Sequence, residues 1–155
     1  MNEIKESAAS KILRIVLYVV FVLGVILTVT MPFMIKYYMQ NLYDAYELHE
    51  GYKIFITIFL MIVGILGLFI VFELILMLRT ITTNPFIKRN VKSLNIIGIT
   101  AFIAAILFFA KCFLYVTILT LLGGICLVIL GLFAFTLADL FKKAVKYKEE
   151  NDLTI

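Results

Sequence analysis

Charged residues are scarce in this sequence, and so are the residue types that build most active sites. Only 15% of its 155 residues are charged, while 64% are hydrophobic. Soluble chains average about 25% charged and about 45–50% apolar residues. A soluble domain of this length cannot bury so much apolar surface, so lipid must solvate most of the chain. The composition therefore predicts an all-α polytopic membrane protein.

Histidine and cysteine, the usual metal ligands and nucleophiles, are also rare. The chain has one histidine, His49, and two cysteines, Cys112 and Cys126, which lie in or beside apolar runs. The cysteines are not spaced as a metal-binding pair or as a disulfide framework. Carboxylates flank His49 within residues 44–50, but no second nitrogen or sulfur ligand stands near them. With no nucleotide-binding loop either, the sequence predicts no enzyme, no metal site and no cofactor.

Four apolar runs are each long enough to cross a bilayer, which requires roughly 20 helical residues. We predict one domain, residues 1–155, folded as a four-helix transmembrane bundle. The expected spans are about 13–35, 54–78, 91–112 and 117–141, followed by a tail at 142–155.

Local signals refine this arrangement. Asn84 suits a helix N-cap and Pro85 suits the first helical position, so the third helix is expected to begin at Pro85. No glycine, proline or asparagine marks the hairpin between the third and fourth spans, which we place near Lys111–Thr117. In the fourth span Gly124, Gly131 and Ala138 recur at seven-residue intervals. Such a stripe of small residues favours close packing against another helix.

Basic residues are distributed unequally between the two ends of the spans. Eleven of the fourteen lie beside one membrane face, namely Lys5, Lys11, Arg14, Arg79, Lys88, Arg89, Lys92, Lys142, Lys143, Lys146 and Lys148. The other face has only Lys36, Lys53 and Lys111. Segments rich in lysine and arginine remain on the cytoplasmic side. We therefore predict that both termini and the Asn84–Pro85 turn are cytoplasmic.

Two acids, Glu73 and Asp139, lie within or at the edge of apolar spans. An ionisable group in a membrane helix is costly and calls for a partner or a function. Lys88, Lys92 and Asn95 follow one another at i, i+4 and i+7 and share a helix face. One interpretation is a polar cluster at the cytoplasmic end of the bundle. The alternative is ordinary interhelical hydrogen bonding and snorkelling, and in either case Glu73 should face another helix.

The tail combines lysines, acids and two apolar residues. Its lysines, from Lys142 to Lys148, suit an amphipathic extension at an anionic lipid surface. Attraction to lipid does not explain Asn151, Asp152 and Leu153, because added acid opposes it. Residues 149–155 are therefore predicted to be a docking element for a partner.

Three features occur together: an acid late in the second span, the motif Asn84-Pro85-Phe86 and the terminal sequence ENDLTI at 150–155. This combination resembles a bacterial family of small four-span membrane proteins of unknown function. Members of that family are typically encoded beside a small helix-turn-helix regulator of the Cro/repressor type. The resemblance implies a location in the bacterial cell membrane and a cytoplasmic DNA-binding partner, with no direct binding of nucleic acid by this chain.

The first functional hypothesis is a non-enzymatic membrane protein whose cytoplasmic face, residues 79–95 and 142–155, binds or regulates that partner. The candidate residues are Glu73, Asn84, Pro85, Phe86, Lys88, Lys92, Asn95, Asp139, Asn151, Asp152 and Leu153. The alternative is a small transporter or channel subunit, as a homo-oligomer, with Glu73 and Asp139 at its inner mouth. A third hypothesis is a membrane-integrity protein without a discrete ligand.

The asymmetry of basic residues predicts a definite topology, which cysteine labelling tests. A cysteine placed at Tyr46 should react with a membrane-impermeant reagent in intact cells, whereas one placed at Thr83 should react only after lysis. The opposite pattern of labelling would refute the predicted orientation.

Overall fold

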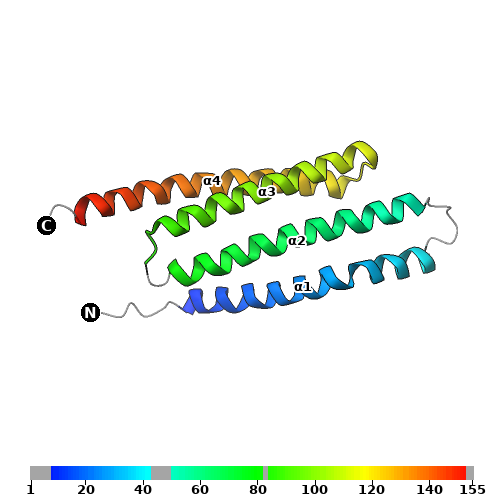
Figure 1. Ribbon diagram of the computed structural model, residues 1–155, viewed down its shortest axis with the longest axis horizontal. Helices are drawn as coiled ribbons and strands as arrows, with labels where there is room; N and C mark the ends of the chain where they lie inside the picture. The colour runs from blue at the N-terminus through cyan, green and yellow to red at the C-terminus, as the bar shows by residue number, and fades with distance from the viewer. Residues whose placement is uncertain (1–7, 43–49, 82–83, 153–155) are drawn as a thin grey trace.

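The computed structural model describes residues 8–42, 50–81 and 84–152. Within these ranges the chain forms no strands and four helices, which confirms the predicted all-α fold. The helices are α1 (Ala8–Leu42), α2 (Glu50–Ile81), α3 (Lys88–Leu114) and α4 (Ile118–Asp152). They run antiparallel to their neighbours, so the start of α1, the α2–α3 connection and the end of α4 share one end of the molecule (Figure 1). We call this the turn end, and the opposite one the hairpin end.

Each helix contains a stretch that is long and apolar enough to cross a membrane. The chain is therefore a multi-pass membrane protein, as its composition predicted. Both α1 and α4 have 35 residues, which corresponds to about 52 Å of helix. The hydrocarbon core of a bilayer is only about 30 Å thick. The excess length allows α4 to continue well beyond the hydrocarbon region.

The helices pack in chain order, α1 on α2, α2 on α3 and α3 on α4. Helix α3 has neighbours on two sides and contains more of the described buried residues than any other helix, whereas no described residue of α1 is buried. The small buried core joins Ile70 of α2, Ile97 and Ala101 of α3, and Ala134 of α4. The outer apolar faces are left for lipid, which solvates them as well as another helix would.

The predicted stripe of small residues on α4 is the seam against α3, where Gly124, Gly131 and Ala138 are all buried. At Gly131 the two helices are so close that an added Cβ would lie 2.7 Å from the ring of Phe102. The same Cβ would lie 3.3 Å from the backbone oxygen of Gly98 on α3. Close backbone approach is therefore what glycine provides at this position.

The α2–α3 connection differs from the sequence-based expectation. Helix α3 begins at Lys88 rather than at Pro85, and its N-cap, Ile87, makes no side-chain capping hydrogen bond. The backbone N–H of Asn84 instead donates to the Thr80 carbonyl at 2.8 Å. The prediction that Asn84 caps α3 was therefore wrong, because its backbone closes the end of α2.

The fully buried side chain of Asn90 holds this connection together. Its Nδ2 donates to the Pro85 carbonyl at 2.7 Å. Its Oδ1 accepts a hydrogen bond from the Thr80 hydroxyl. One amide thus joins the last turn of α2, the bend and the first turn of α3.

At the hairpin end, α3 and α4 are connected by residues 115–117, inside the interval expected from the sequence. Lys111 is buried beneath this connection, and its ammonium group donates to Thr120 Oγ1 at 2.7 Å. The same ammonium group lies 5.7 Å from the centre of the Phe59 ring on α2. A lysine that the sequence analysis counted as a flanking charge therefore helps to fix the hairpin.

The α3–α4 seam predicts that Gly131→Ala will destabilise the protein by about 1–3 kcal/mol, since the new methyl group overlaps Phe102. Unfolding in mixed detergent micelles measures this loss. Gly67→Ala is the matched control, because nothing lies within 4 Å of a Cβ at Gly67. Equal stability of the two variants would contradict the close packing described here.

The buried amide predicts that Asn90→Ala will lower stability by about 1–3 kcal/mol, since the Pro85 carbonyl loses its donor. Asn95→Ala, five residues further along α3, serves as the comparison because Asn95 makes no side-chain hydrogen bond to a described residue. The same unfolding assay applies. If Asn90→Ala is as stable as Asn95→Ala, Asn90 does not hold the connection.

Candidate functional site

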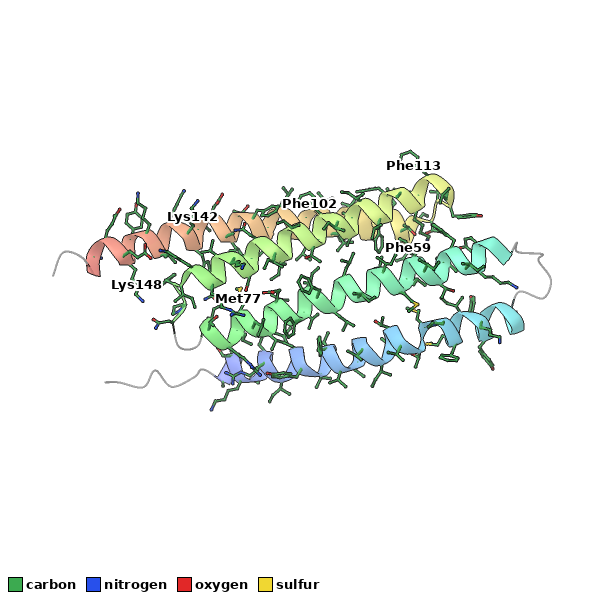
Figure 2. All side chains as sticks on the ribbon, in the orientation of Figure 1. Phe59, Met77, Phe102, Phe113, Lys142 and Lys148 are labelled. Atoms are coloured by element: carbon green, nitrogen blue, oxygen red, sulfur yellow. The ribbon has the colours of Figure 1, made fainter. Side chains whose placement is uncertain are left out.

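The residues that the sequence analysis selected lie at the turn end, in the last turns of α2, the first turns of α3 and the extension of α4. Figure 2 shows Lys142 and Lys148 at this end of α4 and Met77 at the corresponding end of α2, with Phe113 at the opposite end. The charged residues of α4 lie at this end because α4 is longer than its apolar stretch and continues past it.

Three contacts join α4 to the α2–α3 connection and to the first residue of α3. Lys88 forms an ion pair with Glu149, at 2.8 Å between Nζ and Oε1. The Lys148 ammonium group donates to Asn84 Oδ1 at 3.2 Å.

The third contact is aromatic, between the rings of Phe86 and Phe141, whose centroids are 5.9 Å apart. Together the six residues Asn84, Phe86, Lys88, Phe141, Lys148 and Glu149 form one continuous patch, which we call the turn–α4 surface. The structure thus brings together segments that are about sixty residues apart in the sequence.

A groove of about 730 Å³ lies beside this surface, between α3 and α4. It is lined by Lys88, Val91, Asn95, Asp139, Lys142, Lys143, Val145, Lys146 and Glu149. Four of these side chains are lysines and two are acids, so the groove has a positive balance. Val145 is buried and gives the groove part of an apolar floor.

The ion pairs at this end are exposed to solvent. The side chains of Lys88 and Glu149 are 79% and 53% exposed. Lys146 and Glu150, 3.6 Å apart, are similarly exposed. Exposed ion pairs contribute little stability, about 0–1 kcal/mol each. Their charges therefore remain available to a binding partner.

Glu73 lies on the other side of α3. It is 9% exposed and lines a second cavity, of about 420 Å³, between α2 and α3. The other lining residues are Lys88, Arg89, Lys92, Ser93 and Ile96. Glu73 therefore faces another helix, and its burial distinguishes it from Asp139, which is exposed.

The single polar cluster considered from the sequence is divided in the structure. Asp139 and Asn95 line the α3–α4 groove, whereas Glu73 and Lys92 line the α2–α3 cavity. Of the described lining residues, only Lys88 is common to both. Helical spacing predicted that Lys88, Lys92 and Asn95 share one face of α3, but α3 has neighbours on two sides, and Lys92 and Asn95 line different cavities.

The end of the predicted docking element is only partly described. Helix α4 continues to Asp152, and Asn151 is exposed near its end. Leu153 lies outside the described residues, as does His49 with the acids at 44 and 47. Pro85 is half-buried and uses its carbonyl to hold Asn90. Among the described residues, no three histidine, cysteine, aspartate or glutamate side chains are grouped to hold a metal ion.

Neither the role of Asn90 nor the contact between Arg79 and Tyr18 was predicted from the sequence. Arg79 Nε donates to the Tyr18 hydroxyl at 3.1 Å, which ties α1 to α2 at the turn end. Nothing in the sequence singled out Asn90, because its neighbours Lys88, Arg89, Lys92 and Ser93 are polar as well. No spacing rule connects Arg79 with Tyr18, because they are 61 residues apart.

Comparison with known proteins gives a family but no characterised relative. No curated protein and no solved structure matches the chain. Residues 37–155 match the model of a family described as protein of unknown function (DUF2975). This match covers all of α2, α3 and α4 and most of the chain. The earlier resemblance to a family of unknown function is thereby confirmed, and the chain belongs to the DUF2975 family.

Proposed function

We propose that this chain is a non-enzymatic integral membrane protein whose turn–α4 surface binds and regulates a cytoplasmic partner. The observation that supports this most directly is the joining of Asn84, Phe86 and Lys88 to α4. Two separate segments thereby form one shaped surface at the end predicted to be cytoplasmic. The absence of a histidine pair or nucleotide loop from the sequence supports a binding role over catalysis.

The chemistry of the surface indicates what the partner must offer. The surface has two lysines, Lys88 and Lys148, and the groove beside it adds Lys142, Lys143 and Lys146. Three acids lie among these five lysines, namely Asp139, Glu149 and Glu150. Phe86 is 44% exposed and leaves an apolar contact available among these charges. A complementary partner would present an acidic surface around an apolar pocket. Following the resemblance noted in the sequence, we identify this partner as a helix-turn-helix transcriptional regulator.

The alternative, a transporter or channel subunit, requires Glu73 and Asp139 to share one pathway. In the single chain they line different cavities on two sides of α3. Nor do the backbones of α2 and α4 approach each other within the described ranges. The geometry therefore favours the partner-binding function.

Photo-crosslinking tests this proposal. A photoreactive phenylalanine analogue at Phe86 should capture the regulator in intact bacteria, because Phe86 lies on the turn–α4 surface. Phe113 is the matched control, since it is 92% exposed but lies beside the hairpin. Mass spectrometry identifies the captured protein, and equal capture from both positions would contradict the proposed surface.

Truncation after Lys148 provides a second arm of the same experiment. It removes Glu149, the ion-pair partner of Lys88, together with residues 150–155. Capture from Phe86 should then be lost, while insertion and four-span topology persist because all apolar stretches remain. Undiminished capture by the truncated protein would show that the tail is an ordinary helix end.

A further inference from the structure

Glu73 is an unusual residue in its setting. Its side chain is about nine-tenths buried, and no hydrogen bond or ion pair connects it to a described residue. A buried carboxylate without a partner is costly in an apolar environment. In membrane helices such a group marks a site by default. Glu73 lines a cavity of about 420 Å³, which is large enough for a small molecule.

The same cavity contains basic residues that do not neutralise Glu73. Arg89 and Lys92 line it from α3, and neither is paired with a described acid. Lys88 also lines it, but its ammonium group is engaged by Glu149. With respect to the described residues, the cavity therefore holds one unpaired carboxylate, Glu73, and two unpaired cations, Arg89 and Lys92.

Helix geometry explains why these charges remain separate. In a helix each Cα–Cβ bond tilts toward the N-terminus. Because α2 and α3 are antiparallel, Glu73 tilts toward the hairpin end, while Arg89 and Lys92 tilt toward the turn end. Glu73 also lies eight residues before the end of α2, about 12 Å inside it. The cavity thus has a negative inner pole and a positive outer pole.

Two poles of opposite sign select the ligand. An anion alone would meet the cations but would leave Glu73 unpaired. A simple ammonium ion would satisfy Glu73 but would have to pass the basic residues at the outer pole. A small molecule with an ammonium group at one end and an anionic group at the other satisfies both poles.

We propose that the α2–α3 cavity binds a small zwitterion of the phosphoethanolamine type. Its primary ammonium group donates to Glu73, and its phosphate is held by Arg89 and Lys92. The first N–H groups of α3 lie on the phosphate side and are not capped by a side chain at Ile87, which adds favourable interaction with an anion. This site goes beyond the partner-binding function, because Glu73, Arg89 and Lys92 are not part of the turn–α4 surface.

Calorimetric titration of the full chain in phosphatidylcholine nanodiscs tests the proposal. Phosphoethanolamine should bind about 10- to 100-fold more tightly than phosphocholine, whose quaternary ammonium has no N–H to donate. Ethanolamine alone and inorganic phosphate alone should both bind more weakly than phosphoethanolamine. Equal affinity for all four probes would overturn the proposal.

Substitutions test which residues bind each end of the zwitterion. Glu73→Gln should reduce phosphoethanolamine binding to the level of phosphate. The double substitution Arg89→Gln and Lys92→Gln should reduce it to the level of ethanolamine. Glu50→Gln and Lys53→Gln carry the same changes at the other end of α2 and should bind like the wild type. If Glu73→Gln does not fold, the comparison of phosphoethanolamine with phosphocholine on the wild-type chain decides the question.

Changing the lipid distinguishes two sources of the zwitterion, a lipid headgroup and a free small molecule. In nanodiscs containing phosphatidylethanolamine, a lipid headgroup in the cavity would compete with the soluble probe and weaken its apparent affinity. Unchanged affinity would identify the ligand as the free small molecule. In both cases the ammonium group of the ligand binds Glu73. The proposed binding of a regulator is tested separately, by its capture through Phe86.

Discussion

In lipid, backbone polar groups must find their partners within the protein, and this requirement shapes the whole molecule. Helices meet it for most of the chain. At the connection between α2 and α3 the helical hydrogen-bond pattern stops, so the polar groups that are buried there need other partners. Asn90 meets part of the need by donating to the Pro85 carbonyl and accepting from Thr80. This one buried amide sets how α3 leaves α2, and therefore where the basic first turn of α3 lies.

The position of α3 in turn determines the two polar regions at the turn end. Close packing through Gly131 brings α4 near α3, so the extension of α4 can reach Asn84 and Lys88. On its other side, α3 shields Glu73 from lipid. Lys88 contributes to both regions, as the residue at the first position of α3. A partner on one side and a ligand on the other would thus contact the same helix terminus.

Charge at these two regions has different consequences because burial differs. The ion pair between Lys88 and Glu149 is exposed, so water weakens it and a partner can replace it at little cost. Glu73 is buried, so its carboxylate gains far more from a specific partner than an exposed acid does. Asp139 is exposed on α4, so it resembles the exposed ion pair more than it resembles the buried Glu73. The two membrane-edge acids are therefore not equivalent, although the sequence shows both near the ends of apolar spans.

The sequence by itself determined the number of helices, their apolar character and the seam on α4, since these depend on composition and helical spacing along one chain. It also predicted that Lys88, Lys92 and Asn95 share one face of α3, because one helix fixes their relative positions. Only the tertiary structure decided which helix each of them faces, since that depends on how α3 packs between α2 and α4. The capping pattern in the sequence did not predict that α3 starts at Lys88. That pattern considers one segment in isolation, whereas the backbone of Asn84 bonds to the end of α2. Contacts such as Lys88 with Glu149 join residues about sixty positions apart, and no periodicity in a single sequence encodes them.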